Sequence, residues 1–334
     1  MKLRSVLPAL LILCFYYNQV TGQLQGAGIL NEPVDISGDF VDFQNTYYVA
    51  AELSSFSPEK ASGTITYVRY EYTTRMSFNN MLAGLSPVKQ NEFPSNEYEA
   101  SPILPFAIEF IDDRTVRLRA SSGFEKKKDE YSLMIADGVV EPGKSWSYSR
   151  EERKHIYSGS AGRIEIMEKP FRISFYDSEG ALLTSTNTMQ DNSGTFTPVL
   201  PFSFVRRASD YSRSFDAVFN LQPDEKIFGF GESFGQFNKR GSKVVLVTDD
   251  ANGVQNETMY KPIPFYMSSR GYGVFMHTST PITCDMGKYY SGAASLMIGD
   301  ESLDLFVFLG EPREILDAYT DLTGKSPVPP LWSF

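Results

Sequence analysis

The chain has 334 residues, of which 42% are hydrophobic and 22% charged, and its net charge is −10. This balance excludes a disordered chain and is enough for one large domain or two ordinary ones. Nucleic acids and anionic membranes select basic surfaces, so neither is expected to be the main partner of this acidic chain. Aromatic residues reach 14%, which is typical of strand-rich proteins. With 2 Cys and 2 His, the chain has neither a multi-Cys zinc site nor a disulfide-dense scaffold.

The first 22 residues have the layout of a secretory signal peptide. Lys2 and Arg4 precede an apolar run over residues 6–17, and a short polar stretch follows before Gln23. A membrane-spanning helix needs about 20 apolar residues, so a cleaved signal is favoured over a membrane anchor. We therefore expect residues 1–22 to be removed before Gln23 and the protein to be secreted or to enter the secretory pathway.

Removal of this segment would leave Cys284 as the single cysteine, so no intramolecular disulfide is expected. Asn256 lies in an Asn-x-Thr pattern, which is a glycosylation acceptor only in a eukaryotic secretory route.

Alternation of apolar and polar residues dominates the middle of the chain and predicts β-strands. The clearest runs cover residues 64–72, 115–119, 163–168 and 171–176. Turn residues separate the runs, and no long helical segments alternate with them. The pattern predicts an all-β protein with an antiparallel β-sandwich, and it does not support a doubly wound sheet or a complete (β/α)8 barrel.

Two local patterns in the second half of the chain predict a turn and a helix. Asn252 and Gly253 both tolerate positive φ and predict a tight hairpin turn after the apolar run at residues 244–247. Farther on, Pro312 at a first-turn position, an apolar stripe from Ile315 and Leu316 onward, and Gly324 at the end predict a helix.

Known chemical motifs are incomplete or missing. The Gly-Phe-Gly start at residues 229–231 lacks the third glycine of a dinucleotide fingerprint, and the segment from Thr248 lacks the closing Glu of an EF-hand. His155 and His277 lie far apart in sequence, and we expect structural or surface roles for both. Exposed aromatic rings and carboxylates suit sugar recognition, but the same aromatic residues would also fill an ordinary core.

An ordered set of short motifs resembles the N-terminal part of glycoside hydrolase family 31, the family of α-glucosidases and α-xylosidases. The motifs are FGFGESF at residues 228–234, YKPIPFYM at 260–267, SRGYGVF at 269–275, DLFVF at 304–308 and PPLWSF at 329–334. The second motif is most similar to the α-xylosidase branch. The resemblance extends over most of the chain beyond residue 22.

This resemblance implies a galactose mutarotase-like supersandwich over residues 23–326, followed at 327–334 by a linker and the first strand of a catalytic (β/α)8 barrel. The family carries both carboxylates of its retaining mechanism on that barrel. We therefore expect no catalytic residue in this chain, no metal or organic cofactor, and no glycoside hydrolysis by this chain alone.

The resemblance also implies a substrate-binding carboxylate. Asp250 corresponds by position to an Asp on a hairpin that helps to bind the sugar in the −1 subsite. The neighbouring residues depart from the α-glucosidase form, so Asp249 is a second candidate. A carboxylate suits this role because it accepts charge-assisted hydrogen bonds from two sugar hydroxyls. The alternative role for both residues is solvation of a hairpin tip.

Three functions are compatible with these features. The first is the N-terminal portion of a secreted glycosidase of α-xylosides or α-glucosides, in which the sandwich supports a catalytic barrel domain, walls the substrate pocket and provides homo-oligomer contacts. The alternatives are a stand-alone carbohydrate-binding sandwich and a docking subunit for a separate barrel chain. The apolar character of residues 329–334 favours the first, and we expect an uncovered apolar face where the barrel would dock.

Overall fold

The computed structural model describes residues 34–77, 80–88, 101–125, 132–136, 146–188, 200–247 and 261–333. The predicted signal peptide at residues 1–22, the predicted turn at Asn252 and Gly253, and Asn256 lie outside these ranges. Within the described ranges, no helix is both long enough and apolar enough to cross a membrane.

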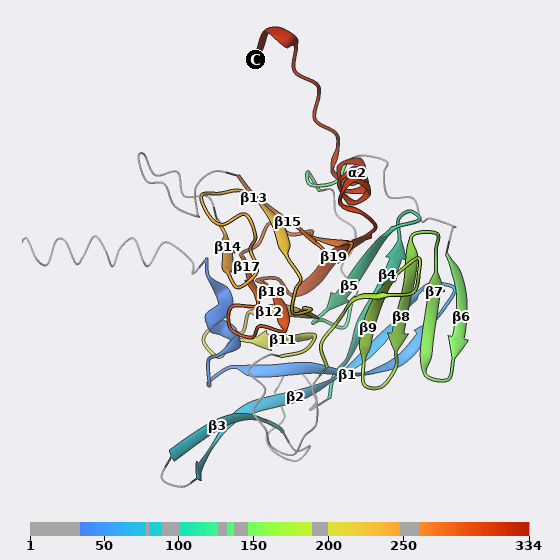
Figure 1. The fold of residues 1–334 in the computed structure, drawn as a ribbon. Helices are drawn as coiled ribbons and strands as arrows, with labels where there is room; N and C mark the ends of the chain where they lie inside the picture. Colours follow the sequence, from blue (N-terminus) through green and yellow to red (C-terminus); the bar gives the residue numbers. More distant parts are fainter. Residues whose placement is uncertain are drawn as a thin grey trace, which may run out of the picture. The chain divides into compact units, whose positions relative to one another are not determined.

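The part of the chain from residue 35 onward contains two antiparallel sheets (Figure 1). The 14-stranded sheet has the order β13-β15-β16-β19-β5-β4-β2-β1-β11-β12-β18-β17-β14, with β3 paired to β2, and the 5-stranded sheet has the order β10-β9-β8-β7-β6. The strands are β1 (Thr46–Ser57), β2 (Ser62–Ser77), β3 (Asn80–Pro87), β4 (Ile103–Phe110), β5 (Thr115–Ser121), β6 (Ser147–Glu151), β7 (Lys154–Ser158), β8 (Gly162–Met167), β9 (Arg172–Asp177), β10 (Leu182–Ser185), β11 (Ser203–Arg206), β12 (Arg213–Asn220), β13 (Ile227–Glu232), β14 (Lys243–Leu246), β15 (Lys261–Ser268), β16 (Tyr272–Met276), β17 (Ile282–Met286), β18 (Ala293–Ile298) and β19 (Ser302–Leu309). The helical elements are η1 (Ile36–Phe40), α2 (Pro312–Thr323) and η2 (Leu331–Ser333).

The large sheet curves, as expected for a twisted sheet of more than about ten strands. Its end strand β14 contacts β15, which is the second strand from the opposite end. The predicted hairpin turn after β14 is outside the described residues, and within them β14 pairs with β17, while β15 pairs with β13 and β16.

The four strands predicted most clearly by alternation are all present, within β2, β5, β8 and β9. In β8 the burial alternates strictly, with Ile164 and Ile166 buried on one face. These two side chains join Phe175 of β9 in one hydrophobic cluster with Ile65 and Leu118 of the large sheet. Since apolar faces of both sheets meet in this cluster, the predicted antiparallel sandwich is confirmed.

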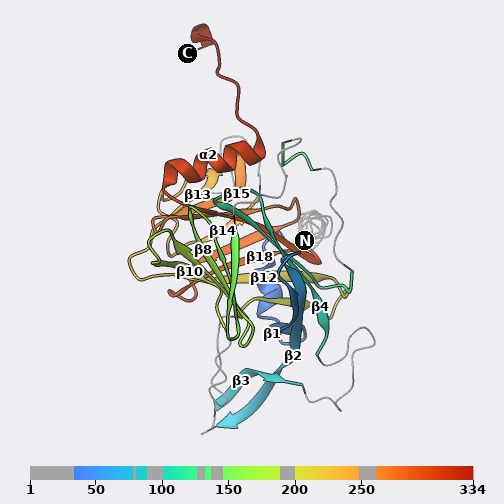
Figure 2. The same ribbon diagram turned by 90° about the vertical axis from the view of Figure 1, so that its right-hand side faces the viewer.

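Helix α2 forms where it was predicted and lies across the ends of several strands (Figure 2). Glu311 and Glu314 form a capping box at its start, and Pro312 occupies its first turn. The buried face carries Ile315, Ala318 and Leu322, which pack on Phe275 and Phe306 of the large sheet. Leu316, which was expected in the apolar stripe, is instead exposed, because adjacent helical positions point about 100° apart.

The residues after α2 are exposed as far as residue 333 (Figure 1). A barrel strand was expected to begin here, but residues 331–333 form the short 3-10 turn η2. A strand needs a neighbour to satisfy its backbone N–H and C=O groups, and the described residues provide none at this position. The Trp332 side chain is 85% exposed, and Leu331 is similarly uncovered.

Candidate functional site

Both predicted sugar-binding residues, Asp249 and Asp250, lie outside the described residues. The structure does describe the strands on either side of their segment, residues 248–260. Strand β14 ends at Leu246, and β15 begins at Lys261. The geometry of the candidate site is therefore built from these two strands and from β13, which pairs with β15.

The start of β15 is aligned against the end of β13. Lys261 faces Glu232, with Nζ 3.6 Å from Oε2, and Pro262 faces Gly231. The register shifts between Gly229 and Gly231, where β15 contributes a longer stretch than β13. Proline cannot donate a ladder hydrogen bond, so it is tolerated at such an irregularity. The result is a local bend directly after the segment that carries Asp249 and Asp250.

Three consecutive residues of β13 have left-handed backbone conformations. The φ angles are +131° at Gly229, +67° at Phe230 and +86° at Gly231. A Cβ atom at Gly231 would lie 1.9 Å from the carbonyl oxygen of Lys261, so only glycine fits there. The Gly-Phe-Gly sequence thus allows the backbones of β13 and β15 to approach each other closely. Strained conformations persist only where the surroundings enforce them, and they concentrate at functional positions.

Phe230 is buried despite its unusual φ, and its ring stacks on Tyr266 with centroids 5.5 Å apart. This aromatic contact offsets the cost of the left-handed conformation, which is of order 1–3 kcal/mol. It also attaches the bend to the core of the sandwich. We infer that the position at which residue 261 enters β15 is rigidly defined.

Exposed apolar side chains occur on β15 and in the residues that follow β13. Phe237 is 82% exposed, and Phe234 and Ile263 are also exposed. We call Phe234, Phe237 and Ile263 the apolar rim. Phe228 contacts Phe237 from β13, with ring centroids 5.0 Å apart. Exposed patches of this kind mark interaction surfaces.

The opposite end of the β13–β15 pair is held by a buried carboxylate, Glu225. Its Oε1 accepts hydrogen bonds from the hydroxyls of Tyr272 at 2.6 Å and Ser268 at 2.5 Å. Its Oε2 accepts the backbone N–H of Gln222 at 2.8 Å. No local sequence pattern predicts this burial, because it depends on β15 and β16, which are distant in sequence.

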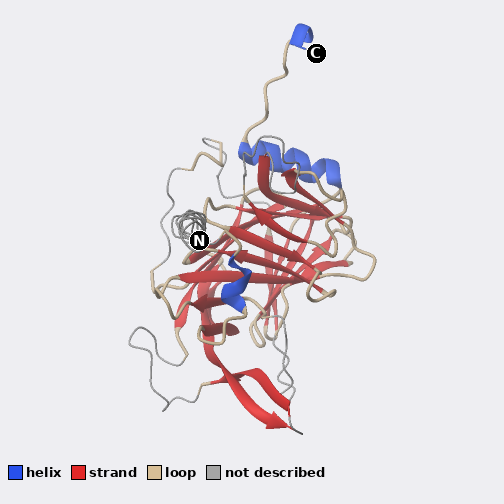
Figure 3. Ribbon diagram, turned by 90° about the vertical axis from the view of Figure 1, so that its left-hand side faces the viewer, coloured by secondary structure: helices blue, strands red, loops and turns tan. Residues whose placement is uncertain are grey.

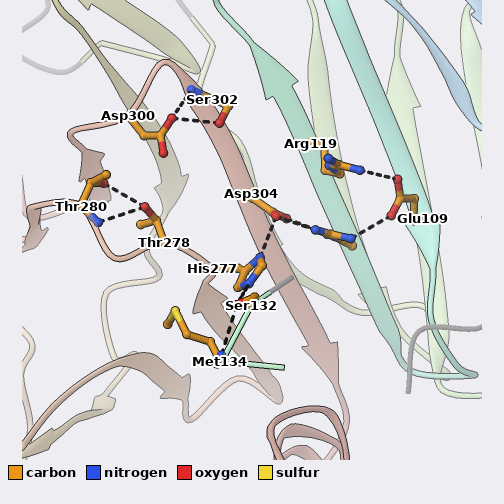
Figure 4. A network of polar contacts seen from close by, with 11 residues as sticks. Glu109, Arg119, Ser132, Met134, His277, Thr278, Thr280, Asp300, Ser302 and Asp304 are labelled. Carbon is orange, nitrogen blue, oxygen red and sulfur yellow. Dashed lines mark hydrogen bonds and ion pairs between the residues drawn. The ribbon is translucent and has the colours of Figure 1, made fainter. Parts of the chain in front are cut away.

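A polar network joins β19 to a loop segment (Figure 4). His277 Nδ1 lies 2.8 Å from Asp304 Oδ2, and His277 Nε2 lies 2.7 Å from Ser132 Oγ. Arg117 contacts both oxygens of Asp304, and Glu109 contacts Arg117 and Arg119. Burial would raise the pKa of Asp304, but the hydrogen bonds from Arg117 and His277 hold it below its usual value.

The Ser132, His277 and Asp304 contacts follow the order of a hydrolytic triad, but the surroundings favour a structural role. Both Asp304 oxygens are engaged by Arg117. Ser132 Oγ already accepts the backbone N–H of Met134 at 3.1 Å. The same segment is anchored again by Ala136, whose N–H donates to the carbonyl oxygen of Leu322 at 2.9 Å. The network therefore attaches residues 132–136 to the sheet and to α2.

The second histidine, His155, is also structural. It is buried, with Nε2 3.1 Å from Glu168 Oε1 and Nδ1 2.9 Å from the Tyr148 hydroxyl. Burial lowers its pKa. The expectation of structural or surface roles is therefore confirmed for both histidines. In the part of the chain that the structure covers, no three His, Cys, Asp or Glu side chains are grouped so as to hold a metal ion.

These observations define an antiparallel β-sandwich with a strained strand at one edge. A sequence model of the glycosyl hydrolase 31 N-terminal galactose mutarotase-like domain matches residues 105–285, more than half of the chain. The chain belongs to this family, as the motif resemblance predicted.

Curated relatives include α-xylosidases. The α-xylosidase of Emericella nidulans is 40% identical over 119 residues, which are 35% of this chain and 15% of that enzyme. The α-xylosidase XylQ of Lactiplantibacillus pentosus is 42% identical over 112 residues, which are 33% of this chain and 15% of that enzyme. The matched part is thus a small fraction of each enzyme.

Solved structures share the fold. A family 31 dextranase of Flavobacterium johnsoniae superposes with a TM-score of 0.60 at 19% identity, covering 85% of this chain and 29% of that one. An α-xylosidase of the same family from a soil metagenome gives a TM-score of 0.55 at 21% identity, covering 68% of this chain and 33% of that one. At these identities, the similarity establishes the architecture.

Proposed function

We propose that this chain is the N-terminal portion of a secreted retaining glycosidase that acts on α-xylosides or α-glucosides. In this proposal the sandwich supports a catalytic barrel domain, and residues 248–260 reach the bound sugar. The observation that carries the proposal is the strained edge of the family's sandwich domain. There Gly231 and Lys261 are in close backbone contact, and Lys261 directly follows the segment that contains Asp249 and Asp250.

The role proposed for Asp250 is binding. Its carboxylate would accept hydrogen bonds from two hydroxyls of the sugar in the −1 subsite, and Asp249 is the substitute for this role. Bond cleavage would belong to two carboxyl groups about 5–5.5 Å apart on the barrel, one acting as nucleophile and the other as acid/base. That mechanism uses neither a metal nor an organic cofactor.

The apolar rim supports a docking role for the same edge. Phe234, Phe237 and Ile263 are exposed on β15 and in the residues that follow β13. Leu331 and Trp332, beyond α2, are exposed as well. Contact with a barrel domain would bury such side chains, each contributing about 1.5–3 kcal/mol when fully covered.

Kinetics on the full-length enzyme with aryl α-xyloside and α-glucoside would test the proposal. We expect Asp250→Asn to lower kcat/KM by about 10- to 100-fold, because it removes charge-assisted hydrogen bonds to the sugar. Asp249→Asn tests whether Asp249 binds the sugar in place of Asp250. Glu59→Gln, an exposed carboxylate on a distant turn, is the matched control and should be neutral.

Two results would contradict the proposal. One is wild-type kcat/KM in both Asp variants, which would remove the binding role. The other is turnover of either aryl glycoside by the 334-residue chain alone, which would place the catalytic acids within it.

A further inference from the structure

A cavity of about 260 Å³ lies between η1 and strands β12, β14, β17 and β18. Figure 3 shows η1 as the short helix that lies across the strands. The cavity is on the face of the large sheet that points away from the sandwich core. On β18, Leu296 and Ile298 point into the core cluster, whereas Met297 packs with η1 and lines the cavity.

Polar residues from three neighbouring strands meet at this cavity. Asp216 on β12 is 3% exposed, and its Oδ1 accepts a hydrogen bond from the Ser295 hydroxyl at 2.6 Å. Ser295 on β18 faces Asp285 on β17 in the sheet register. All three side chains line the cavity. A carboxyl group has about four acceptor positions, so Asp216 retains hydrogen-bonding capacity for a ligand.

Asp285 positions the aromatic mouth of the cavity. Its Oδ1 accepts the backbone N–H groups of Lys288 at 2.8 Å and Tyr289 at 3.2 Å. These bonds fix the turn that carries Tyr289 and Tyr290, whose side chains line the cavity while remaining exposed, Tyr289 at 79%. Phe40 and Leu200 complete an apolar wall.

The lining selects a neutral ligand with both hydroxyls and an apolar face. An anion would face the carboxyl groups of Asp216 and Asp285, and the Lys243 ammonium is already paired with Asp35. A divalent cation would find two carboxylates together with the Lys243 ammonium, which is a poor ligand set. Burial raises the pKa of Asp216 to about 7, so this group is protonated in a large fraction of molecules near neutral pH and suits an uncharged partner.

We propose that this cavity is a second carbohydrate-binding site, which takes one neutral pyranose unit. In this site Asp216 contacts sugar hydroxyls, Tyr289 and Tyr290 cover the ring, and Asp285 holds the tyrosine turn. Ligand pockets typically combine apolar and aromatic walls with a few placed polar groups, as this cavity does. The lining residues named above are not part of the segment 248–260 that the catalytic proposal uses, so this proposal goes beyond the catalytic one and does not depend on it.

Saturation-transfer NMR and calorimetric titration of the 334-residue chain with D-xylose and D-glucose would test this site. We expect weak binding of at least one of these sugars, reduced about five- to tenfold in Tyr289→Ala and in Asp216→Asn, since each removes one ligand contact. Tyr211→Ala, at an exposed tyrosine on another turn, should bind as the wild type does. D-glucuronate should bind more weakly than D-glucose because of the two aspartates.

The proposal is overturned if neither sugar shows saturation transfer, or if both are bound equally well by the wild type, Tyr289→Ala and Asp216→Asn. It is also overturned if only Asp250→Asn loses binding, since the sugar would then occupy residues 248–260. Should Asp216→Asn fail to fold, Tyr289→Ala still decides, because its side chain is exposed on a turn. Failure of the catalytic proposal would appear only in the kinetics of the full-length enzyme.

Discussion

The Arg117 guanidinium holds both oxygens of the Asp304 carboxylate, with Nε 2.8 Å from Oδ1 and Nη2 2.7 Å from Oδ2. These residues lie on β5 and β19, which are adjacent in the middle of the large sheet. Arg117 also lies over the Phe306 ring, 5.1 Å from its centroid. The bidentate pair therefore fixes the Asp304 carboxylate in the orientation that His277 requires.

Removing Arg117 should destabilise the fold severely. Arg117→Met keeps much of the side-chain volume but leaves Asp304 buried without its cation, which costs about 3–5 kcal/mol. Lys169→Met is the matched control, because it breaks the exposed Lys169–Glu52 pair, with a cost of about 0–1 kcal/mol. Urea unfolding of both variants measures the difference. Equal shifts of the two unfolding midpoints would show that the buried Arg117–Asp304 pair contributes no more to stability than the exposed Lys169–Glu52 pair.

Gly231→Ala should disrupt the edge of the sheet beside residues 248–260. A Cβ atom there meets the carbonyl oxygen of Lys261 and also forces a residue with a side chain into positive φ. Gly180→Ala separates these effects, because Gly180 also has positive φ, +88°, but has no atom within 4 Å of its Cβ position. We expect Gly180→Ala to cost about 1–2 kcal/mol and Gly231→Ala clearly more. Thermal unfolding of the two variants compares them, and equal losses would mean that the backbone contact is not tight in solution.

Stability should depend on pH through Asp216. The unfolded chain ionises this carboxyl near its ordinary pKa of 3.8, whereas burial raises the pKa in the folded protein to about 7. The folded state therefore retains the extra proton between these values, and the contribution of Asp216 to the free energy of unfolding falls as the pH rises through this window.

Asp216→Asn cannot ionise, so it should gain stability relative to the wild type between about pH 5 and pH 8, by an amount on the order of 3 kcal/mol. Urea unfolding of both proteins at the two pH values gives the comparison. Asp224→Asn, at an exposed carboxyl, should show no such pH-dependent gain. A pH-independent difference between Asp216→Asn and the wild type would contradict burial as the source of the raised pKa.

Ser132→Ala should increase local opening of residues 132–136. It deletes the hydrogen bond to His277 and the acceptor for the Met134 amide, each worth about 1 kcal/mol. Faster hydrogen exchange at the Met134 amide is the expected readout, with Ser160→Ala as an exposed control. Covalent labelling of wild-type Ser132 by a fluorophosphonate would show instead that the network activates a nucleophile.

The sequence predicts local features of this fold well, because they depend on neighbouring residues. Alternation identifies β8 through Ile164 and Ile166, and the capping residues identify α2. The pairing of β5 with β19 depends on residues nearly two hundred positions apart and leaves no local pattern. The buried roles of Glu225 and Arg117 are missed for the same reason.

The candidate site was predicted only in part. Family resemblance pointed to Asp249 and Asp250, and their role remains a prediction. The Gly-Phe-Gly motif was noticed in the sequence, but its purpose became clear only when Gly231 was seen against the backbone of Lys261. The cavity at Asp216 was not anticipated, because strands β12, β17 and β18 and helix η1 converge there from distant parts of the chain.

The left-handed residues of β13 have one more effect. This strand ends the 14-stranded sheet, so one of its sides has no strand beside it in the described fold. A flat terminal strand offers its free N–H and C=O groups to strands of other molecules, which is a route to amyloid-like association. The positive φ angles at Gly229, Phe230 and Gly231 make that row irregular, which disfavours templated aggregation along this border.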